Sequence, residues 1–303
     1  MERITTIAAL RARVRAARGA GQVVGFVPTM GALHEGHLAL VRLAAERAEL
    51  VVVSVFVNPT QFDRPDDLAA YPRDLAGDEA ALDALGLATP MIVFAPAAEE
   101  MYPRRPLTTV TVAGLGDHLC GASRPGHFDG VATVVTKLLS IVAPDLAVFG
   151  RKDRQQLQIV RRLVADLDLP VEIVAGPTAR EGDGLARSSR NRRLAAADRP
   201  RARTLSRALR AAVLAAEQAR AEGREVLPED VRAAAEGVLR SAEVVLDYLE
   251  VVDADSMQPS AAPISAARPA VLAVAAEVAG VRLIDNVELG DAADEARLLA
   301  ATT

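Results

Sequence analysis

The sequence predicts an α/β fold, in which a Rossmann-like, doubly wound parallel sheet is followed by a smaller α+β domain. Three observations predict it. Five short runs in the first 180 residues are nearly continuous in Val, Ile, Leu and Phe, as in strands that are covered on both faces. Helical stretches separate these runs, and the order β-α-β favours parallel strands. After Pro177 the composition changes, because the chain becomes rich in Arg and Ala.

The first domain is expected to span residues 1–180. We expect its strands at residues 22–27, 50–57, 91–95, 146–149 and 171–175. We expect helices between them at residues 37–48, 74–85, 129–142 and 153–167. Residues 97–128 interrupt this rhythm with Pro, Gly and a Thr-Thr-Val-Thr-Val run, which suggests an insertion over one edge of the sheet.

The second domain is expected to span residues 181–303 and to act as a lid. Nine Arg occur between residues 180 and 207, and Ala-rich helical stretches continue to about residue 241. Two alternating runs follow at residues 243–252 and 271–288, the second of them broken by Gly280. This pattern predicts a small antiparallel sheet.

Composition limits the function classes. The chain of 303 residues is 50% hydrophobic and has a net charge of −5, which disfavours a nucleic-acid partner. The single Cys120 cannot form an intrachain disulfide and fits a reducing compartment. No run approaches the roughly 20 apolar residues of a membrane helix, and Arg and Glu interrupt the N-terminal segment. We therefore expect a cytoplasmic protein without a membrane partner, and an inert Cys120.

Unusual polar segments follow four of the expected strands. They are PTMGALHEGH after residues 22–27, NPTQF after 50–57, GRKDRQQ after 146–149, and GPT with LARSSRN after 171–175. In a doubly wound sheet, ligands bind beyond the carboxyl ends of the strands. The four segments therefore predict one ligand site at that edge.

Two of the four histidines, His34 and His37, lie three residues apart in the first segment. Zinc proteases need an i, i+4 pair, so zinc is disfavoured, although it stays an alternative together with two ordinary surface histidines. Contact with a phosphate is favoured, because Gly31 and Gly36 let the backbone approach a ligand. A helix that begins near Gly36 would direct its free N–H groups at an anion.

Lysine is rare in this chain. Of the 35 basic residues 33 are Arg, and the two Lys are Lys137 and Lys152. A coding bias toward Arg explains the composition, but a lysine that survives it can mark a position where a compact ammonium is needed. Lys152, in GRKDRQQ, is therefore a candidate phosphate ligand.

The motif His-x-Gly-His resembles the signature of the nucleotidylyl-transferase superfamily. PTMGALHEGH, NPTQF, YPRD, RPGHFDGV, FGRKDRQQL and DGLARSSRN, together with the C-terminal LIDN, more narrowly resemble the pantothenate synthetase (pantoate–β-alanine ligase) family over essentially the whole chain. The resemblance implies that ATP and pantoate form pantoyl adenylate and pyrophosphate, and that β-alanine then displaces AMP. It also implies Mg²⁺ and a homodimer, with the run 50–57 or the insertion 97–128 as possible interfaces.

The resemblance also implies roles for individual residues. His37 would be the proton donor, and His34, Lys152 and Arg190 would act with it on the phosphates. The ATP site would comprise Met30, Gly31, Ala32, Leu33, His34, Glu35, Gly36, His37, Gly150, Arg151, Lys152, Asp153, Ala179, Arg187, Ser188, Ser189 and Arg190. Gln61 and Gln156 would hold pantoate, with Asn58 and Arg124 lining the same cleft. Asp78 would be a metal ligand.

Some positions depart from the family pattern. Arg151, Arg154 and Arg187 replace residues that are usually not basic, which suggests added cations near ATP. Thr60 stands where Met is usual and could make the pantoate pocket more polar. Two other hypotheses therefore stay open: another nucleotidylyltransferase of the same fold, and a non-catalytic, nucleotide-binding regulatory homologue.

Overall fold

The computed structural model describes residues 1–62 and 65–301 and divides the chain into two compact units. The first unit contains Met1–Gly116, Arg124–Arg151 and Ile159–Gly176. The second unit contains Asp117–Ser123, Lys152–Gln158 and the chain from Pro177 onward. The main boundary lies close to the expected one at residue 180, but two short earlier segments also group with the second unit.

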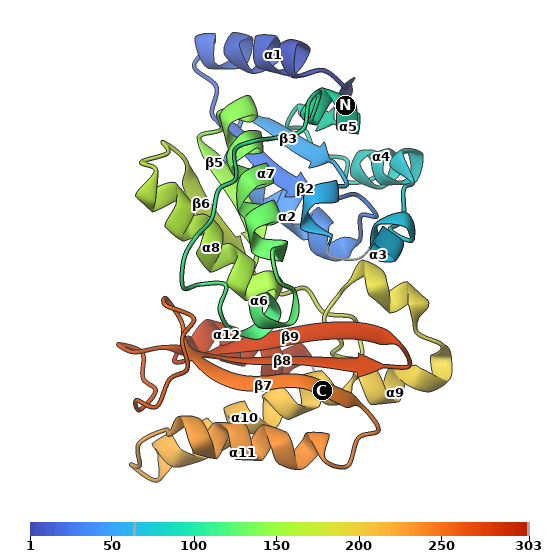
Figure 1. Ribbon diagram of the computed structural model, residues 1–303. Coiled ribbons are helices and arrows are strands. Elements are labelled where there is room, and N and C mark those ends of the chain that lie inside the picture. Colours follow the sequence, from blue (N-terminus) through green and yellow to red (C-terminus); the bar gives the residue numbers. More distant parts are fainter. Residues whose placement is uncertain (63–64, 302–303) are drawn as a thin grey trace. The chain divides into compact units, whose positions relative to one another are not determined.

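The first unit is built on a six-stranded sheet with the strand order β1-β4-β3-β2-β5-β6. Four of these strands, β2, β3, β5 and β6, are labelled in Figure 1. Every pairing between neighbouring strands of the sheet is parallel, which confirms the predicted doubly wound class. The strands are β1 (Glu2–Ile4), β2 (Val24–Thr29), β3 (Leu50–Val55), β4 (Met91–Phe94), β5 (Leu146–Gly150) and β6 (Glu172–Gly176). The sequence prediction missed β1, because three residues with one buried side chain give no apolar run.

The first unit also contains the helices that connect these strands. They are α1 (Ile7–Gly19), α2 (Glu35–Ala45), α3 (Pro65–Ala69), α4 (Leu75–Asp83), α5 (Ala98–Met101), α7 (His127–Val142) and α8 (Arg154–Asp166). The first turn of α8 groups with the second unit and the rest of α8 with the first. The prediction missed α1, α3 and α5 and placed the longer helices within two or three residues of their bounds.

Both faces of the sheet are buried. Alternate residues of the central strands, such as Val27, Val51 and Val53, form one apolar cluster with Leu40 and Val41 of α2. Their neighbours Phe26 and Val52 are also fully buried, so side chains cover the second face as well. Because β3 pairs with both β2 and β4, it is an interior strand. The suggestion that residues 50–57 supply a dimer interface was therefore wrong for the strand itself.

The second unit contains a three-stranded antiparallel sheet in the order β7-β8-β9, as the alternating runs predicted. Its strands are β7 (Val245–Asp253), β8 (Ala270–Val278) and β9 (Val281–Leu289). Its helices are α6 (Leu119–Ser123), α9 (Arg199–Ala202), α10 (Thr204–Ala221), α11 (Pro228–Leu239) and α12 (Ala292–Ala301). Ala279 and Gly280 both have positive φ, as a two-residue hairpin turn between β8 and β9 requires.

The expected insertion 97–128 does not form one structural piece. It contains α5 and a stretch without helix or strand at residues 105–112, and both belong to the first unit. Residues 117–123, which include α6, belong to the second unit instead. Among residues 1–62 and 65–301, no helix combines the length and the apolar character that crossing a membrane would require.

Candidate active site

The turn after β2 carries the two histidines of the His-x-Gly-His motif. Thr29 ends the strand, and its hydroxyl donates to the Ser54 carbonyl at 2.7 Å and accepts the Gly31 N–H at 3.1 Å. Gly31 and Ala32 then adopt positive φ values of 79° and 51°. The chain thus reverses tightly between the strand and the start of α2.

A buried carboxylate holds this turn. Asp78 of α4 is 4% exposed, and its two oxygens accept the backbone N–H groups of Ala32 at 3.0 Å and Leu33 at 2.6 Å. A Cβ atom on Gly31 would lie 2.7 Å from an oxygen of Asp78, so a side chain at position 31 would collide with the anchor. Glycine is therefore required here both for its backbone angle and for space.

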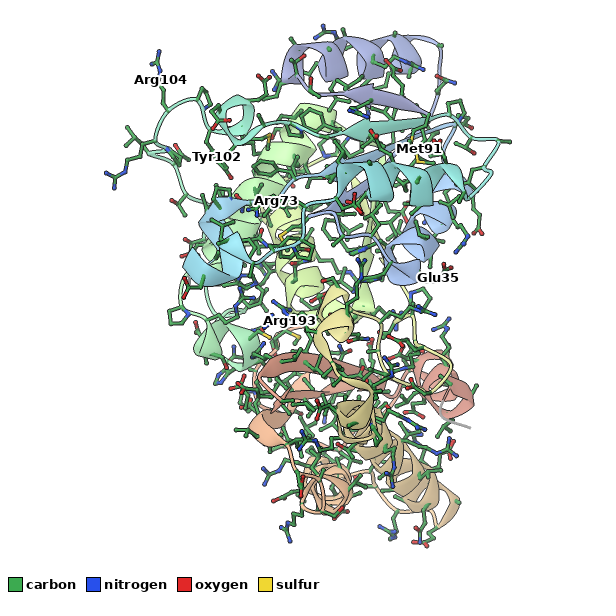
Figure 2. The ribbon with its side chains drawn as sticks, turned by 90° about the vertical axis from the view of Figure 1, so that its right-hand side faces the viewer. Glu35, Arg73, Met91, Tyr102, Arg104 and Arg193 are labelled. Atoms are coloured by element: carbon green, nitrogen blue, oxygen red, sulfur yellow. The ribbon has the colours of Figure 1, made fainter. Side chains whose placement is uncertain are left out.

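His34 and His37 stack at the beginning of α2. Their ring centroids are 4.0 Å apart, with 21° between the ring planes. The Nδ1 atom of His34 accepts the Gly36 N–H at 3.1 Å, so His34 caps the helix and a neutral His34 carries its proton on Nε2. Glu35, between them, forms an ion pair with Arg42 and points outward (Figure 2). The Nε2–H of His34 is a donor suited to an anion, and the positive end of the helix dipole favours one there.

Asp78, the expected metal ligand, binds the backbone of the turn before α2. Both oxygens of Asp78 accept backbone N–H groups of the turn. Within the part of the chain that the structure describes, no three or more His, Cys, Asp or Glu side chains gather as a metal site would require. The described side chains therefore do not form a complete metal-binding set by themselves, and the assignment of Asp78 to a metal stays a prediction.

Gln61, the expected pantoate ligand, is fixed by its neighbours. The side-chain amide of Asn58 donates to Gln61 Oε1 at 3.2 Å, and Gln61 Nε2 lies 3.0 Å from the sulfur of Met30. Asn58 is 1% exposed and accepts the Tyr102 hydroxyl at 2.9 Å. Burial raises the pKa of Tyr102, which keeps this donor protonated. With its oxygen engaged by Asn58, Gln61 presents its NH₂ group as a donor.

The segment RPGHFDGV supports Gln61 from α7. His127 Nδ1 donates to the Gln61 carbonyl at 2.8 Å, and Arg124 reaches the same oxygen at 3.4 Å. A Cβ atom on Gly130 would lie 2.4 Å from the Thr60 carbonyl oxygen, so only glycine lets the helix pack this closely on the NPTQF segment. Arg124 and Asn58 were predicted to line the cleft, and both are brought to Gln61.

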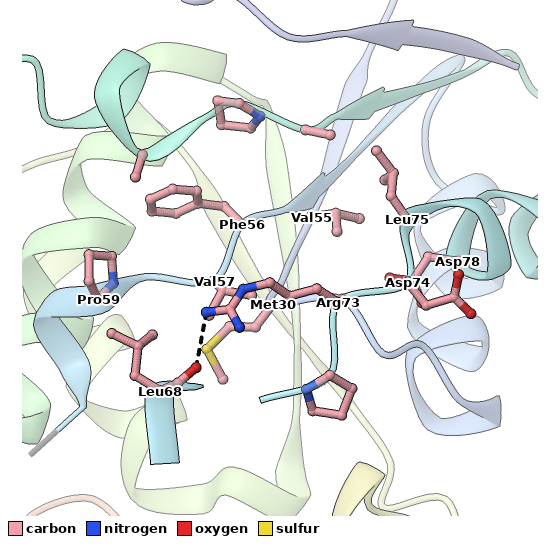
Figure 3. Close-up of a pocket in the computed structure, with 15 residues that line it drawn as sticks. Met30, Val55, Phe56, Val57, Pro59, Leu68, Arg73, Asp74, Leu75 and Asp78 are labelled. Atoms are coloured by element: carbon pink, nitrogen blue, oxygen red, sulfur yellow. Dashed lines mark hydrogen bonds between the residues drawn. The ribbon is translucent and has the colours of Figure 1, made fainter. Parts of the chain in front are cut away.

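A cavity of about 410 Å³ lies beside the turn in the first unit (Figure 3). Met30, Val55 and Phe56 form part of its wall, together with Arg73 from the YPRD segment. The guanidinium of Arg73 donates to the Leu68 carbonyl at 2.9 Å and to the Tyr71 carbonyl. Since its cation is directed at the backbone, the cavity suits an apolar group better than a phosphate.

Gly150 ends β5, which pairs with β2 in parallel. The carboxyl ends of the two strands, and hence the Met30–His37 turn and Gly150, lie at the same edge of the sheet, as predicted. Arg151, Lys152 and Asp153 follow directly, in a 3₁₀ turn (Arg151–Asp153). Within the second unit, the Lys152 carbonyl accepts the side-chain amide of Asn286 at 2.8 Å.

Arg154 does not add a cation for ATP, contrary to one expectation. It is 5% exposed and forms an ion pair with Glu288 at 2.9 Å, within the second unit. Its guanidinium also donates to the Ala254 carbonyl at 3.1 Å. The charge of Arg154 is therefore neutralised inside the second unit. Gln156, the second expected pantoate ligand, is partly buried on the same segment.

The Ser188–Arg190 segment opens a 3₁₀ helix (Ser189–Arg193) of the second unit. The Ser188 hydroxyl accepts the Arg190 N–H at 3.2 Å, and the Arg190 side chain is exposed. Just before it, Arg180 and Ala186 form an antiparallel bridge, and the Arg187 N–H donates to the Ala179 carbonyl at 2.9 Å. Arg187 Nε donates to the Arg180 carbonyl at 3.3 Å, so part of its guanidinium is bound to the backbone.

Thr60, which was expected to make the pantoate pocket more polar, donates its hydroxyl to Asn58 Oδ1 at 3.0 Å.

Comparison with known proteins decides the family. The profile described as pantoate-beta-alanine ligase matches residues 2–288 of this chain. The chain belongs to the pantoate–β-alanine ligase family. The chain is 50% identical over 284 residues to a pantothenate synthetase of Cereibacter sphaeroides, covering 94% of this chain and 98% of that protein. It is 49% identical to one of Moorella thermoacetica, covering 95% and 99% of the two chains.

Solved structures of ligases of this family share the fold. A crystal structure of pantothenate synthetase from Thermus thermophilus matches with a TM-score of 0.84 and 45% identity, covering 95% of this chain and 99% of that chain. A Francisella tularensis pantoate-beta-alanine ligase complexed with beta-gamma ATP and beta-alanine matches with a TM-score of 0.75 and 32% identity, over 96% and 98%. The predicted family, fold class and ligase activity are confirmed.

Several supporting residues of this ligase escaped the sequence prediction. The hydroxyl of Tyr102, the imidazole of His127 and the amide of Asn286 all act on residues that were predicted. Each is 44 or more positions away in the sequence from its partner. No local motif joins such pairs, although RPGHFDGV and LIDN had been noted as matching segments.

Proposed function

We propose that this chain joins pantoate to β-alanine in two steps at the expense of ATP. A pantoate carboxylate oxygen attacks the α-phosphorus of ATP, the bond to the bridging oxygen breaks, and pyrophosphate leaves. The β-alanine amine then attacks the acyl carbon of pantoyl adenylate and loses a proton, and AMP leaves with the electrons of the acyl–oxygen bond. Such chemistry needs orientation and charge stabilisation rather than a covalent nucleophile.

The observation that carries this proposal is the stacked pair His34 and His37 at the start of α2, at the carboxyl edge of the parallel sheet. We assign His37 as proton donor and His34 as a donor to phosphate oxygens. Gln61 donates its NH₂ group to an oxygen of pantoate, and Gln156 contributes a second amide. We place the turn from Met30 to His37 against ATP, although the N–H groups of Gly31, Ala32, Leu33 and Gly36 are already bound within the protein.

From the second unit, we assign Lys152 and Arg190 to the charge of the phosphates, and Asp153 to the ribose hydroxyls. Ser188 and Ser189 add hydroxyl donors, while Gly150, Arg151, Ala179 and Arg187 complete the nucleotide site. Mg²⁺ enters with ATP, whose phosphate oxygens are the hard ligands that it prefers. Since both oxygens of Asp78 accept backbone N–H groups, we expect ATP and water to supply most of the ligands of Mg²⁺.

A homodimer and a cytoplasmic location stay predictions of this proposal. Leu107, in the 105–112 stretch, is 96% exposed and is a candidate contact between copies. Light scattering of the purified protein measures the assembly state, and a monomer at micromolar concentration would contradict the dimer. The substitution Leu107→Ser should weaken the dimer if this residue lies in the interface.

One assay separates the proposed activity from its two rivals. Exchange of labelled pyrophosphate into ATP should require pantoate, and AMP release should require both pantoate and β-alanine. Turnover with a different nucleotide-accepting substrate would favour another transferase. Tight ATP binding without exchange would favour a regulatory protein.

The variant His37→Ala tests the central assignment. It should lower exchange by about 10²–10⁴-fold, the range of positioned acid–base groups. The variant Arg42→Ala, which breaks the ion pair with Glu35 on the same helix, is the control and should stay within about twofold. Unchanged exchange in His37→Ala would remove the assignment of His37.

A further inference from the structure

Strand β9 of the second unit has an apolar face and a polar face. Leu283, Val287 and Leu289 belong to the apolar core that the sheet shares with α10 and α11. Because side chains alternate along a strand, Asn286 and Glu288 point to the opposite face. Both are well buried there: Asn286 is 6% exposed and the Glu288 side chain is 14% exposed.

The polar face holds the segment that carries Lys152. The Asn286 amide donates to the Lys152 carbonyl at 2.8 Å, although the two residues are 134 positions apart. Two residues further along β9, Glu288 pairs with Arg154 at 2.9 Å. Arg154 and Gln158 both donate to the Ala254 carbonyl, at the end of β7. The start of α8 is thus fixed at three points to the sheet of its own unit.

Asp285, the residue before Asn286, places a carboxylate on the apolar face of β9. Asp285 is 3% exposed and forms a two-pronged ion pair with Arg180, at 2.6 and 3.0 Å. Burial alone would lower the pKa of Arg180, but the charge and hydrogen bonds of Asp285 raise it, so the buried guanidinium stays charged. Arg180 also donates to the Gly184 carbonyl at 3.1 Å and begins the bridge that leads to Ser188.

We propose that Asp285 and Asn286 are positioning residues, which set the place of Lys152 and of the Ser188–Arg190 segment within the second unit. This inference rests on the proposed role of these cations at the phosphates. The backbone position of Lys152 limits the region that its ammonium can reach. Lys152 lies in a three-residue 3₁₀ turn, which has little stability of its own. The Asn286 bond fixes that turn.

The contact requires a hydrogen-bond donor at position 286. The partner is a carbonyl oxygen, which can only accept, so the side chain must donate. The change Asn286→Asp keeps size and shape but sets a carboxylate oxygen against the Lys152 carbonyl. The turn should then shift, and a displacement of about 1 Å at a catalytic group can cost about 10²-fold in rate.

The test compares single and double variants of the full-length protein by pantoate-dependent ATP–pyrophosphate exchange. Asn286→Asp should lower kcat/KM for ATP by about 10- to 100-fold. Lys152→Ala should lower it further, and adding Asn286→Asp to Lys152→Ala should cost less than about twofold, because Asn286 acts through Lys152. A merely structural role would give losses that multiply. Multiplying losses, or wild-type exchange in Asn286→Asp, would overturn the proposal.

Two more variants keep the result interpretable. Arg282→Gln is the matched control, since Arg282 lies on the same face of β9 but pairs with Asp247 at 2.6 Å; exchange should stay within about twofold. If Asn286→Asp does not fold, Glu288→Gln tests the neighbouring ion pair with Arg154. It should lower kcat/KM for ATP by about three- to tenfold, and this loss should again disappear on the Lys152→Ala background. Wild-type exchange in Lys152→Ala would instead refute the proposed role of Lys152.

Discussion

The turn that carries His34 and the turn that carries Lys152 are both held by buried polar side chains from distant parts of the sequence, but by opposite chemistry. In the first unit, the Asp78 carboxylate accepts two N–H groups of the turn before α2. In the second unit, the Asn286 amide donates to a carbonyl of the turn before α8. The first anchor is an acceptor and the second is a donor.

The difference follows from what each backbone leaves unpaired. A tight turn with two positive φ values, at Gly31 and Ala32, directs successive N–H groups to one side, where only an acceptor can satisfy them. The 3₁₀ turn at Lys152 presents a carbonyl toward the sheet, and only a donor can satisfy it. The same need to hold a short turn in place is therefore met by an anion in one unit and by a neutral amide in the other.

Loss of the buried ion pair between Asp285 and Arg180 should lower stability more than any other change considered below. Asp285→Ala leaves the Arg180 charge buried without its partner, and breaking such a pair typically costs about 3–5 kcal/mol. The free energy of unfolding from urea titration should fall by that amount. The surface pair of Arg224 and Glu222 provides the control, since Glu222→Ala should leave the free energy of unfolding almost unchanged. A small loss in Asp285→Ala would show that β9 tolerates this uncompensated charge.

Lys152→Ala should have the next largest effect, on rate rather than on stability. Removing one positioned donor to developing charge typically costs about 10²–10³ in kcat, equivalent to roughly 3–4 kcal/mol. Lys152→Arg should lose about tenfold, because a planar fork does not replace a compact ammonium. The matched control is Lys137→Arg, since the ammonium of Lys137 lies over the Tyr102 ring and an arginine can take that place. Equal activity of the two arginine variants would contradict the special role of Lys152.

Asp78→Asn tests the first anchor. In the variant, the remaining side-chain oxygen still accepts one backbone N–H group, but the new NH₂ group faces the second N–H group and cannot accept it. One hydrogen bond to a charged acceptor, worth about 1.5–3 kcal/mol, is therefore lost. Stability should fall by that amount, and adenylation should slow because His34 follows the turn directly. The Mg²⁺ concentration that gives the half-maximal rate should stay unchanged. A shift of that concentration to higher values with full stability would instead support Asp78 as a metal ligand.

The smallest effect is expected at the opposite edge of the first sheet. Asp145, just before β5, accepts the Val24 N–H at 2.8 Å and pairs with Arg18 at 2.6 Å. Burial raises its pKa, but these two contacts outweigh burial and lower it overall. Its stabilisation is therefore present above the unfolded-state pKa of roughly 3.9 and lost as the pH falls through the lower folded-state value.

Asp145→Asn should accordingly cost less than about 1 kcal/mol at pH 7, since the pair is more than one-third exposed, and almost nothing near pH 2. Urea unfolding of both proteins at the two pH values measures the difference. The turnover number should not change, because the residue lies at the amino ends of the strands. A pH-independent difference in stability would mean that the ionised carboxylate is not responsible.

The fold class and the chemical character of the candidate site follow from the amino-acid sequence alone. Continuous apolar runs between helical stretches require a parallel sheet that is covered on both faces, and β2 and β5 indeed bring Met30 and Gly150 to one edge. The motif His34-x-Gly-His37, the isolated Lys152 and the order of the matching segments led to the family. These features are local in sequence, and local patterns are what periodicity and motif spacing record.

How these groups are held depends on tertiary packing, which the sequence patterns do not record. This packing directed Arg154 to Glu288 rather than to a ligand, gave Asp78 to the backbone of the His34 turn, and joined Asn286 to Lys152. It also made β3 an interior strand. The partner of a buried charge or carbonyl depends on which distant chain segment packs against it, because a buried polar group must find its hydrogen bond wherever the fold provides one.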